Sequence, residues 1–276
     1  MHTPTLHRLS RSALYVLTLM AVIMSVFPIF YLLLLSIKPA HLTFDPGTWI
    51  FEPTLANYEA VLEGGDFVKY MINSLTISFA TMLVALALGT LAAYGFARFK
   101  FRGRFWLRMS MLIPQMLPPI TIIVPLYVLF MNLDFLDTRH GMVIAYLTFT
   151  LPLATWMMTG FFEDVPVELE ESAMVDGASR LGALLRVSLP IVAPGLAATA
   201  VLAFIYSWNE FLYAVILTGR ESRTLPVTIT SYMTNKAILW GRIAAAGSIV
   251  LIPVLAFAML TQRYLVRGLA GGAVKG

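Results

Sequence analysis

Six long stretches without Asp, Glu, Lys or Arg alternate with shorter polar intervals along the 276 residues of the chain. A helix needs about 20 residues to cross about 30 Å of hydrocarbon, and each stretch is long enough. An open strand in lipid would leave its backbone groups unsatisfied, so each stretch is predicted to be helical. We therefore predict an all-α polytopic membrane protein, with one transmembrane domain over residues 1–276. Its six helices are expected at about residues 12–37, 70–97, 109–133, 141–162, 191–215 and 243–262.

The distribution of basic residues predicts the orientation of these helices. If the N-terminus is cytoplasmic, twelve of the nineteen Lys and Arg residues fall in cytoplasmic segments and seven fall outside. The short loop of residues 98–108 holds five of the twelve and no acid, and basic loops favour the cytoplasmic side. Both termini are therefore expected in the cytoplasm. The first stretch follows two arginines, as a secretory signal does, but it is too long for one and is expected to be a retained helix.

Composition supports the membrane assignment and excludes several kinds of chemistry. Hydrophobic residues make up 59% of the chain and charged residues only 12%, whereas soluble domains have about 25% charged residues. Cysteine is absent, and the four histidines lie in termini and loops without metal-ligand spacing. No phosphate-binding loop is present. We expect no metal, no bound cofactor, no ATP hydrolysis by this chain and no nucleic-acid partner.

A polar interval between two apolar stretches, residues 163–190, predicts a helix, a bend and a second helix at the membrane face. Pro166 and the glutamates that follow it predict a helix start, because proline tolerates the first turn and carboxylates favour the positive end of the helix dipole. Asp176 and Gly177 predict its end, with a positive φ at the glycine, and Ser179 can cap the second helix. The bend is therefore expected at Gly177.

This interval resembles the EAA motif of ATP-binding cassette (ABC) importer permeases, a Glu-Ala-Ala triplet followed by a spaced Gly and a Leu-Pro pair. The middle Ala of the triplet is Ser172 in this chain. In that family the loop is a coupling helix that seats in a groove on a separate ATPase subunit. An ordinary amphipathic loop is the alternative. The residues that the resemblance implies for the coupling loop are Glu170, Glu171, Ser172, Ala173, Asp176, Gly177, Ala178, Leu184 and Pro190.

Polar and helix-breaking residues inside the apolar stretches indicate a translocation pathway. Four prolines in the third stretch predict a bent or broken helix, which membranes tolerate where it lines a cavity or is buried in protein. Glu210 follows the fifth charge-free stretch and lies within the expected helix 191–215, where an ionisable residue is costly unless it faces a partner or water. Part of this stretch resembles a Trp-Asn-acid pattern in sugar-importer permeases. The pathway candidates are Asn73, Pro118, Pro119, Trp208, Asn209 and Glu210.

Each of these residues also has a simpler interpretation. The prolines fit a helix that is merely kinked for packing. Asn73 near a helix end can cap that helix or bond to a neighbour. Trp208 and Glu210 fit an interfacial belt in which the carboxylate already reaches the headgroup region.

The resemblance covers nearly the whole chain and is greatest to the maltose-type branch of the family. It implies a non-enzymatic subunit of a bacterial inner-membrane importer for a sugar or sugar derivative, working by alternating access. Its implied partners are a second similar permease, two ATPase subunits that bind ATP and Mg, an extracytoplasmic solute-binding protein and membrane lipid. An ion-coupled carrier would need ionisable residues near the bilayer midplane, and a membrane-anchored enzyme would need a convergent catalytic set; neither is visible.

Overall fold

A computed structural model describes residues 4–234 and 237–273, with side chains from residue 13 to residue 260 within these limits. The described backbone is helical and contains no β-strand beyond one isolated bridge, which agrees with the predicted all-α class. It divides into two compact units. The first contains the residues up to Phe67 with Ile229–Ile252, and the second contains Val68–Thr228 with the residues from Pro253 onward.

Among the described residues, four helices are long and apolar enough to cross a membrane, or up to six spans exist if each of two bent helix pairs counts as one. The first bent pair turns by 97° between Met116 and Pro119. The second turns by 77° between Ile191 and Ala193. The predicted count of six spans therefore depends on how these bends lie in the bilayer. The four continuous spans are Ala13–Ser36, Phe67–Arg98, Arg139–Glu163 and Trp240–Leu260.

The first unit joins the first and last spans through polar side chains near their ends. The Tyr58 hydroxyl lies 2.8 Å from the hydroxyls of both Ser36 and Ser248. The Asn57 amide donates to the carbonyls of Ser36 and Lys38, each at 2.9 Å. Its helices are α1 (Pro4–Ser36), η1 (Ala40–Leu42), α2 (Ala56–Glu63) and the first part of α13 (Trp240–Ala273).

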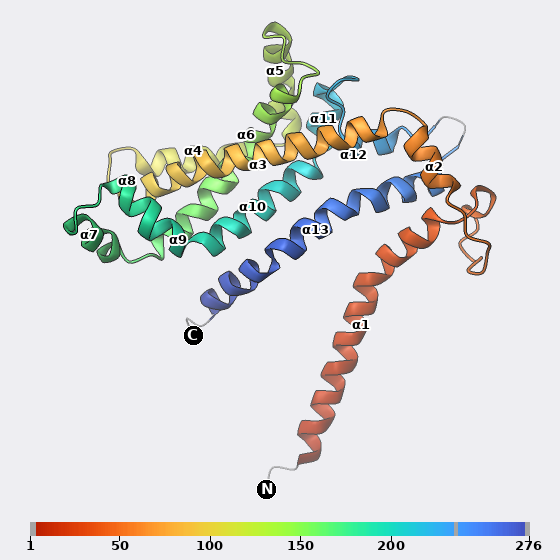
Figure 1. Ribbon diagram of the computed structural model, residues 1–276, viewed down its shortest axis with the longest axis horizontal. Helices are drawn as coiled ribbons and strands as arrows, with labels where there is room; N and C mark the ends of the chain where they lie inside the picture. Colours follow the sequence, from red (N-terminus) through yellow and green to blue (C-terminus); the bar gives the residue numbers. More distant parts are fainter. Residues whose placement is uncertain (1–3, 235–236, 274–276) are drawn as a thin grey trace. The chain divides into compact units, whose positions relative to one another are not determined.

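The second unit holds the rest of the helices (Figure 1). Within it α6 packs against α4 and α10, and α11 packs against α5 and α6. The short helix α7 packs against α8 and the π-helical turn η2. In chain order these elements are α3 (Phe67–Arg98), α4 (Arg104–Met116), α5 (Pro119–Asn132), α6 (Arg139–Glu163), α7 (Val167–Val175), α8 (Arg180–Ala183), η2 (Leu184–Ser188), α9 (Leu189–Ile191), α10 (Ala193–Trp208), α11 (Leu212–Leu217) and α12 (Leu225–Thr230).

The structure corrects the predicted third and fifth helices, which are interrupted. The expected helix 109–133 breaks at Leu117, which is extended (ψ 142°) because a residue before proline is forced out of the helical region. The expected helix 191–215 stops at Trp208 and resumes at Leu212. The sequence signalled the first break through its prolines, whereas nothing local signalled the second.

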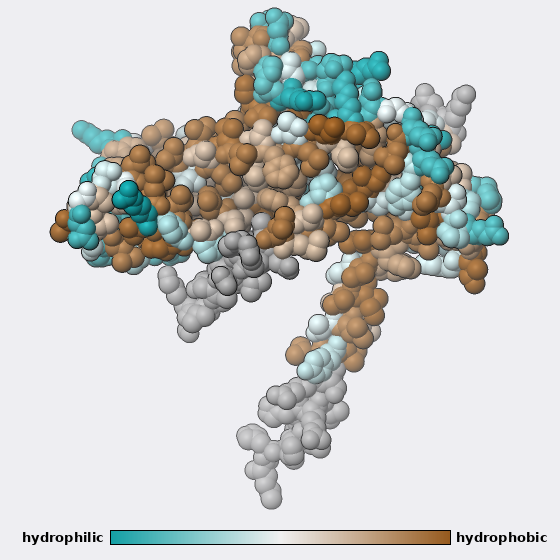
Figure 2. All heavy atoms as spheres, in the orientation of Figure 1, coloured by the Kyte–Doolittle hydropathy of each residue, from teal (hydrophilic) through white to brown (hydrophobic). Residues whose placement is uncertain are grey.

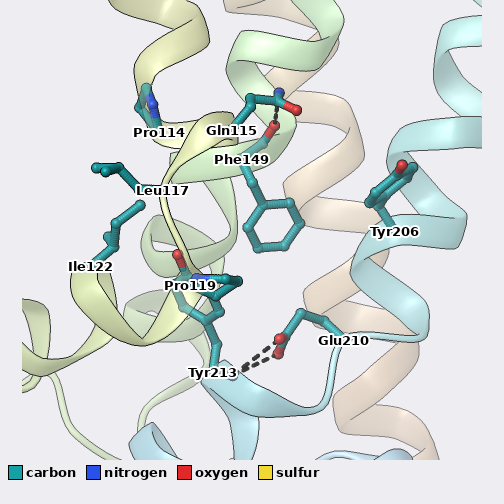
Figure 3. Close-up of a pocket in the computed structure, with 9 residues that line it drawn as sticks. All are labelled: Pro114, Gln115, Leu117, Pro119, Ile122, Phe149, Tyr206, Glu210 and Tyr213. Carbon is teal, nitrogen blue, oxygen red and sulfur yellow. Dashed lines mark hydrogen bonds between the residues drawn. The ribbon is translucent and has the colours of Figure 1, made fainter.

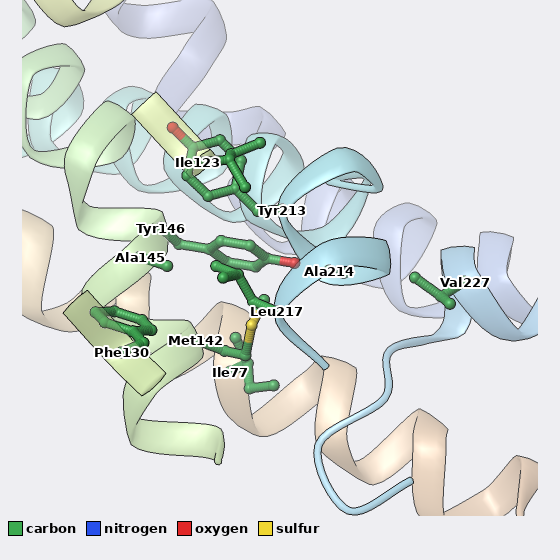
Figure 4. Packing of buried hydrophobic residues seen from close by; sticks show 10 residues of the cluster. All are labelled: Ile77, Ile123, Phe130, Met142, Ala145, Tyr146, Tyr213, Ala214, Leu217 and Val227. Atoms are coloured by element: carbon green, nitrogen blue, oxygen red, sulfur yellow. The ribbon is translucent and has the colours of Figure 1, made fainter. Parts of the chain in front are cut away.

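An apolar cluster fastens the two helix breaks to the long helices (Figure 4). It combines side chains of α3, α5, α6, α11 and α12. The aromatic rings of Tyr146 and Tyr213 lie edge to face at 6.4 Å, an arrangement that stabilises aromatic pairs. The buried members are Ile77, Ile123, Phe130, Met142, Ala145, Tyr146, Tyr213, Ala214, Leu217 and Val227.

Apolar side chains cover much of the exposed sides of the long helices (Figure 2). In the second unit, hydrophilic side chains gather near α5 and α11, and others are scattered at the end that carries α7 and α8. Such a surface suits a bilayer flanked by polar headgroups. The chain is therefore a multi-pass membrane protein by fold and by surface.

The close packing of α3 on α6 predicts a specific sensitivity at Gly89. A Cβ there would lie 2.9 Å from the Ala154 Cβ and 3.1 Å from the Thr155 nitrogen, whereas a Cβ at Gly95 in the same helix meets nothing within 4 Å. We expect Gly89→Ala to lower stability by about 1–3 kcal/mol through overpacking. Gly95→Ala should be neutral or stabilising by up to about 1 kcal/mol. Thermal unfolding of the detergent-purified protein checks the pair, and equal midpoints for both variants would contradict the packing.

Candidate coupling loop and translocation pocket

The helix α7 ends in a hydrogen-bonded bend centred on Gly177. The Gly177 N–H donates to the Met174 carbonyl at 3.1 Å and the Ala178 N–H donates to the Ala173 carbonyl at 2.9 Å. These two bonds form a Schellman motif, which requires a left-handed residue, and Gly177 has φ +94°. The predicted positive φ at Gly177 is therefore confirmed.

A second helical segment starts directly after this bend. The Ser179 hydroxyl accepts from the Gly182 N–H at 3.1 Å, so Ser179 is the predicted N-cap of α8. The segment continues through the π-helical turn η2 into α9, where Pro190 lies in the first turn and remains exposed. The expected helix, bend and helix are all present in residues 163–190.

The residues predicted for the coupling loop divide into an outward and an inward set. Glu171, Ser172, Asp176 and Gly177 are exposed, Ala173 and Ala178 are half-buried, and the adjacent Val175 is 87% exposed. Glu170 and Leu184 instead point into the protein. Only the outward set can meet another protein without rearrangement, and an exposed apolar side chain such as Val175 suits such a contact.

Glu170 accepts hydrogen bonds from three side chains, two of them on α3 and one on η2. Arg98 Nε at the end of α3 lies 2.8 Å from Glu170 Oε1, and Tyr94 Oη lies 2.8 Å from Oε2. The Ser188 hydroxyl in η2 also donates to Oε1. Burial alone would raise the pKa of the Glu170 carboxyl, but the bonds from Ser188, Arg98 and Tyr94 together with the Arg98 charge hold it below its ordinary value. The carboxylate is thus charged at neutral pH although it is buried.

A pocket of about 280 Å³ opens between the break that separates α4 from α5 and the break that separates α10 from α11 (Figure 3). Glu210 is its charged member, and its carboxylate accepts from the backbone N–H groups of Tyr213 at 3.0 Å and Ala214 at 3.2 Å. The Gln115 amide reaches the Phe149 carbonyl at 3.2 Å. The lining residues are Pro114, Gln115, Leu117, Pro119, Ile122, Phe149, Tyr206, Glu210 and Tyr213.

Two of the six predicted pathway residues, Pro119 and Glu210, line this pocket. Pro118 lies beside it as the residue that precedes α5. Trp208 is 1% exposed and stacks on Phe204 in the interior, at 5.6 Å between ring centroids. Asn209 ends α10 and donates to the Ile205 carbonyl at 3.0 Å. The pathway assignment stays a prediction for each of them.

Asn73 takes part in a different polar site, which holds the segment after α11. Its amide donates to the carbonyls of Glu221 at 2.7 Å and Arg223 at 3.0 Å, and its oxygen accepts from Arg139 Nε at 2.8 Å. Asn73 is fully buried, so these contacts correspond to the simpler interpretation of an asparagine bonded to neighbours.

Asp137 holds the same segment from the turn between α5 and α6. Its carboxylate accepts from the backbone N–H groups of Gly219 and Ser222, each at 2.8 Å, and from Glu221 at 3.1 Å. Burial alone would raise the pKa of Asp137, but these backbone bonds lower it. The charged form is therefore the one that fastens the segment.

Sequence reasoning missed several residues of both sites. Arg98 was assigned only to the basic topology loop, and its partner Glu170 lies 72 positions away. In the sequence, Tyr206 and Phe149 could not be distinguished from the other aromatic residues of the apolar stretches. Gln115 could have been identified from the sequence, because an uncharged amide next to a proline in a membrane helix indicates a polar site. Among the described residues, no three His, Asp or Glu side chains are grouped so that they could hold a metal ion.

Interrupted membrane helices beside a pocket that contains one carboxyl group, together with an exposed helix–bend–helix loop, are the features of a membrane permease. The chain belongs to the family of binding-protein-dependent transport system inner membrane components, which it matches over residues 85–271. It is a permease subunit of an ABC importer, and ATP hydrolysis in such importers belongs to a separate subunit.

Relatives match the chain over almost its full length. It is 35% identical to the trehalose transport system permease protein SugB of Mycobacterium tuberculosis, over 97% of this chain and 99% of the relative. It is 34% identical to the trehalose/maltose transport system permease protein MalG of Thermococcus litoralis, over 97% and 98%. A bacterial ABC transporter that imports the acidic polysaccharide alginate shares the fold, with a TM-score of 0.78, 21% identity and coverage of 96% and 99%.

The pocket geometry predicts that Glu210→Gln lowers uptake several-fold while the subunit is still made. The amide oxygen can still accept one backbone N–H, so the start of α11 is kept, but the pocket loses its charge. Tyr206→Phe is a companion variant that changes the pocket without touching this cap. Uptake kinetics and subunit content in membranes check both, and unchanged kinetics in Glu210→Gln would favour the interfacial-belt interpretation.

Proposed function

We propose that this chain is one of two permease subunits of an ATP-driven, binding-protein-dependent importer for a sugar or sugar derivative. It forms half of the translocation pathway, and its loop 163–190 couples that pathway to ATPase subunits. The partners are a second homologous permease, two ATPases that carry ATP and Mg, and an extracytoplasmic solute-binding protein. The location is the bacterial inner membrane.

The observation that carries the coupling role is the construction of the loop. The short helix α7 is exposed on one face and ends in the tight bend at Gly177. On its opposite face, the buried carboxylate of Glu170 holds it to the rest of the protein. The chain continues from α7 through α8, η2 and α9 into the membrane helix α10. A protein that binds the outward face of α7 is therefore connected to a membrane span. The residues of α7 and its bend that are proposed to contact the ATPase are Glu171, Ser172, Val175 and Asp176.

The sugar class is supported by the names of the relatives and by the chemistry of the pocket. SugB and MalG are named for trehalose and maltose transport. A carboxylate and an amide can hydrogen-bond sugar hydroxyls, and the aromatic rings of Tyr206 and Phe149 offer apolar faces beside them. Selectivity among sugars is expected to lie largely with the solute-binding protein.

Alternating access is the proposed mechanism. ATP binding closes the ATPase dimer, and the loop carries that rigid-body movement into the membrane helices. The proposal includes six spans, with α4 and α5 together forming the third and residues 191–215 forming the fifth, and cytoplasmic termini. Twelve basic residues then lie inside against seven outside.

Single cysteines test the orientation cleanly, because the chain has none of its own. Arg102 and Glu63 are both exposed, on opposite sides of the proposed membrane. We expect an impermeant thiol reagent to label Glu63→Cys in intact cells whose outer barrier is opened, and to label Arg102→Cys only after the inner membrane is permeabilised. The reverse pattern would overturn the proposed orientation.

Replacing Gly177 tests the coupling function itself. A side chain at φ +94° strains the backbone by about 1–2 kcal/mol, although among the described residues no atom beyond the adjacent positions lies within 4 Å of the new Cβ. Gly177→Ala should be mild, and Gly177→Val should lose ATPase association or uncouple ATP use from uptake. A change of 1.4 kcal/mol at a docking interface is about tenfold in affinity.

The matched control is Gly103→Val, which has φ +90° and equally open space but lies outside the loop. The purified complex is assayed for subunit stoichiometry, ATP hydrolysis and uptake. Wild-type coupling in Gly177→Val, or equal losses in Gly103→Val, would contradict the assignment. Failure of an ATPase to co-purify with the wild-type chain would contradict the proposed function as a whole.

A further inference from the structure

Arg98 and Glu170 form a buried ion pair between a membrane span and the coupling loop. Their side chains are 5% and 4% exposed, and the Nε–Oε1 distance is 2.8 Å. Arg98 also donates from Nη2 to the Val165 carbonyl at 2.9 Å, in the segment just before α7. One guanidinium therefore fixes both the start and the middle of the coupling region to the end of α3.

Apolar side chains enclose this pair. The surrounding cluster combines residues of α3, α6, the coupling loop and the start of the next span, and the Tyr94 and Phe162 rings meet edge to face at 5.6 Å. In such surroundings, removal of one charge leaves the other buried without compensation, which is strongly destabilising. The buried members of the cluster are Ala93, Tyr94, Met158, Phe162, Val165, Leu184 and Val192.

The other two ion pairs among the described residues at this end of the unit, which join Glu163 to Arg104 and to Arg108, are of a different kind. Arg108 lies 2.8 Å from Glu163, but the two side chains are 26% and 42% exposed. Exposed pairs of this type contribute little to stability. The comparison shows that the buried pair is not a general feature of the basic loop but a particular connection to α7.

The π-helical turn supplies the remaining contact. The wider turn of η2 places the Ser188 hydroxyl on Glu170, although Ser188 lies 18 positions along the chain. Single π turns inside helices are frequent at functional sites. Glu170 is thus the point where α3, α7 and the segment leading to α10 are joined.

We propose that Arg98 and Glu170 are positioning residues that lock the coupling helix α7 to the span α3, so that a displacement of the loop moves the span as one body. This inference rests on the proposed coupling function. The outward face of α7 receives the ATPase, and the opposite face carries Glu170 into the protein. Without the pair, movement of α7 would be absorbed at the joint instead of being passed to α3.

The test measures the distance between α7 and α3 in the assembled complex. Spin labels on Glu168→Cys and Leu91→Cys occupy exposed positions of the two helices, in an otherwise cysteine-free complex. The distance distribution is recorded without nucleotide and with ATP trapped by vanadate. With the pair intact, we expect one narrow distribution that is the same in both states.

Arg98→Gln should broaden the distribution and make it depend on ATP, while the same substitution in the exposed pair, Arg108→Gln, should leave it unchanged. Tyr94→Phe and Ser188→Ala each remove one bond to Glu170 without leaving an unpaired charge. Both variants should broaden the distance distribution and make it depend on ATP, but less than Arg98→Gln does. If the Arg98→Gln complex does not assemble, these two variants provide the test.

Two results would overturn the inference. One is an unchanged distribution in every variant that assembles. The other is equal broadening with and without ATP, because a purely structural contact would loosen both states alike. Neither result would affect the proposed function, which fails only if the wild-type chain does not assemble with an ATPase or does not transport.

Discussion

The structure depends on the need of every backbone N–H and C=O inside a bilayer to find a partner within the protein. Unbroken helices meet this need by themselves, but this chain interrupts two of its spans. At the second interruption the carboxylate of Glu210 accepts the N–H groups of Tyr213 and Ala214, which have no helical carbonyl to bond. The Asn209 N–H still reaches the Ile205 carbonyl. The break is therefore capped from within, and a pocket can exist beside it.

Carboxylates perform the same task at three joints of the second unit. Glu210 holds the start of α11, Asp137 holds the segment that follows α11, and Glu170 holds α7. Each accepts several hydrogen bonds, which compensate for the burial of a polar group. At Asp137 and Glu170 these bonds hold the pKa of the carboxyl below its ordinary value. Glu171 is exposed on α7, beside the buried Glu170, and its carboxylate points away from this joint.

The local features of the coupling loop could be predicted from sequence because they depend on residues close together in the chain. The Schellman bend at Gly177 and the cap at Ser179 each involve positions within five residues, and propensity rules describe such distances well. The prolines likewise identified the break at Leu117. The presence of membrane-spanning helices could be predicted from the length of the apolar stretches alone.

The features that were missed are those made by distant residues. Glu170 was grouped with Glu171 as an outward coupling residue, because adjacent acids in a helix start look alike in sequence. Only the tertiary contact with Arg98 separates them. The break between Trp208 and Leu212 was invisible for a related reason, since an acid in an apolar run suggested a pathway residue and not a helix cap.

These joints determine how the two sites can communicate. The loop is followed by α8, η2 and α9, and then by α10, whose 16 residues end at the Glu210 break. A straight helix of this length spans about 24 Å and transmits displacement without absorbing it. Close packing holds α10 against α6, since a Cβ at Gly195 would lie 2.3 Å from the Phe161 ring. The coupling loop thus reaches the membrane by two routes, through the ion pair into α3 and through the chain itself into α10. Only the second route ends beside the pocket, because Glu210 lies two residues after the end of α10.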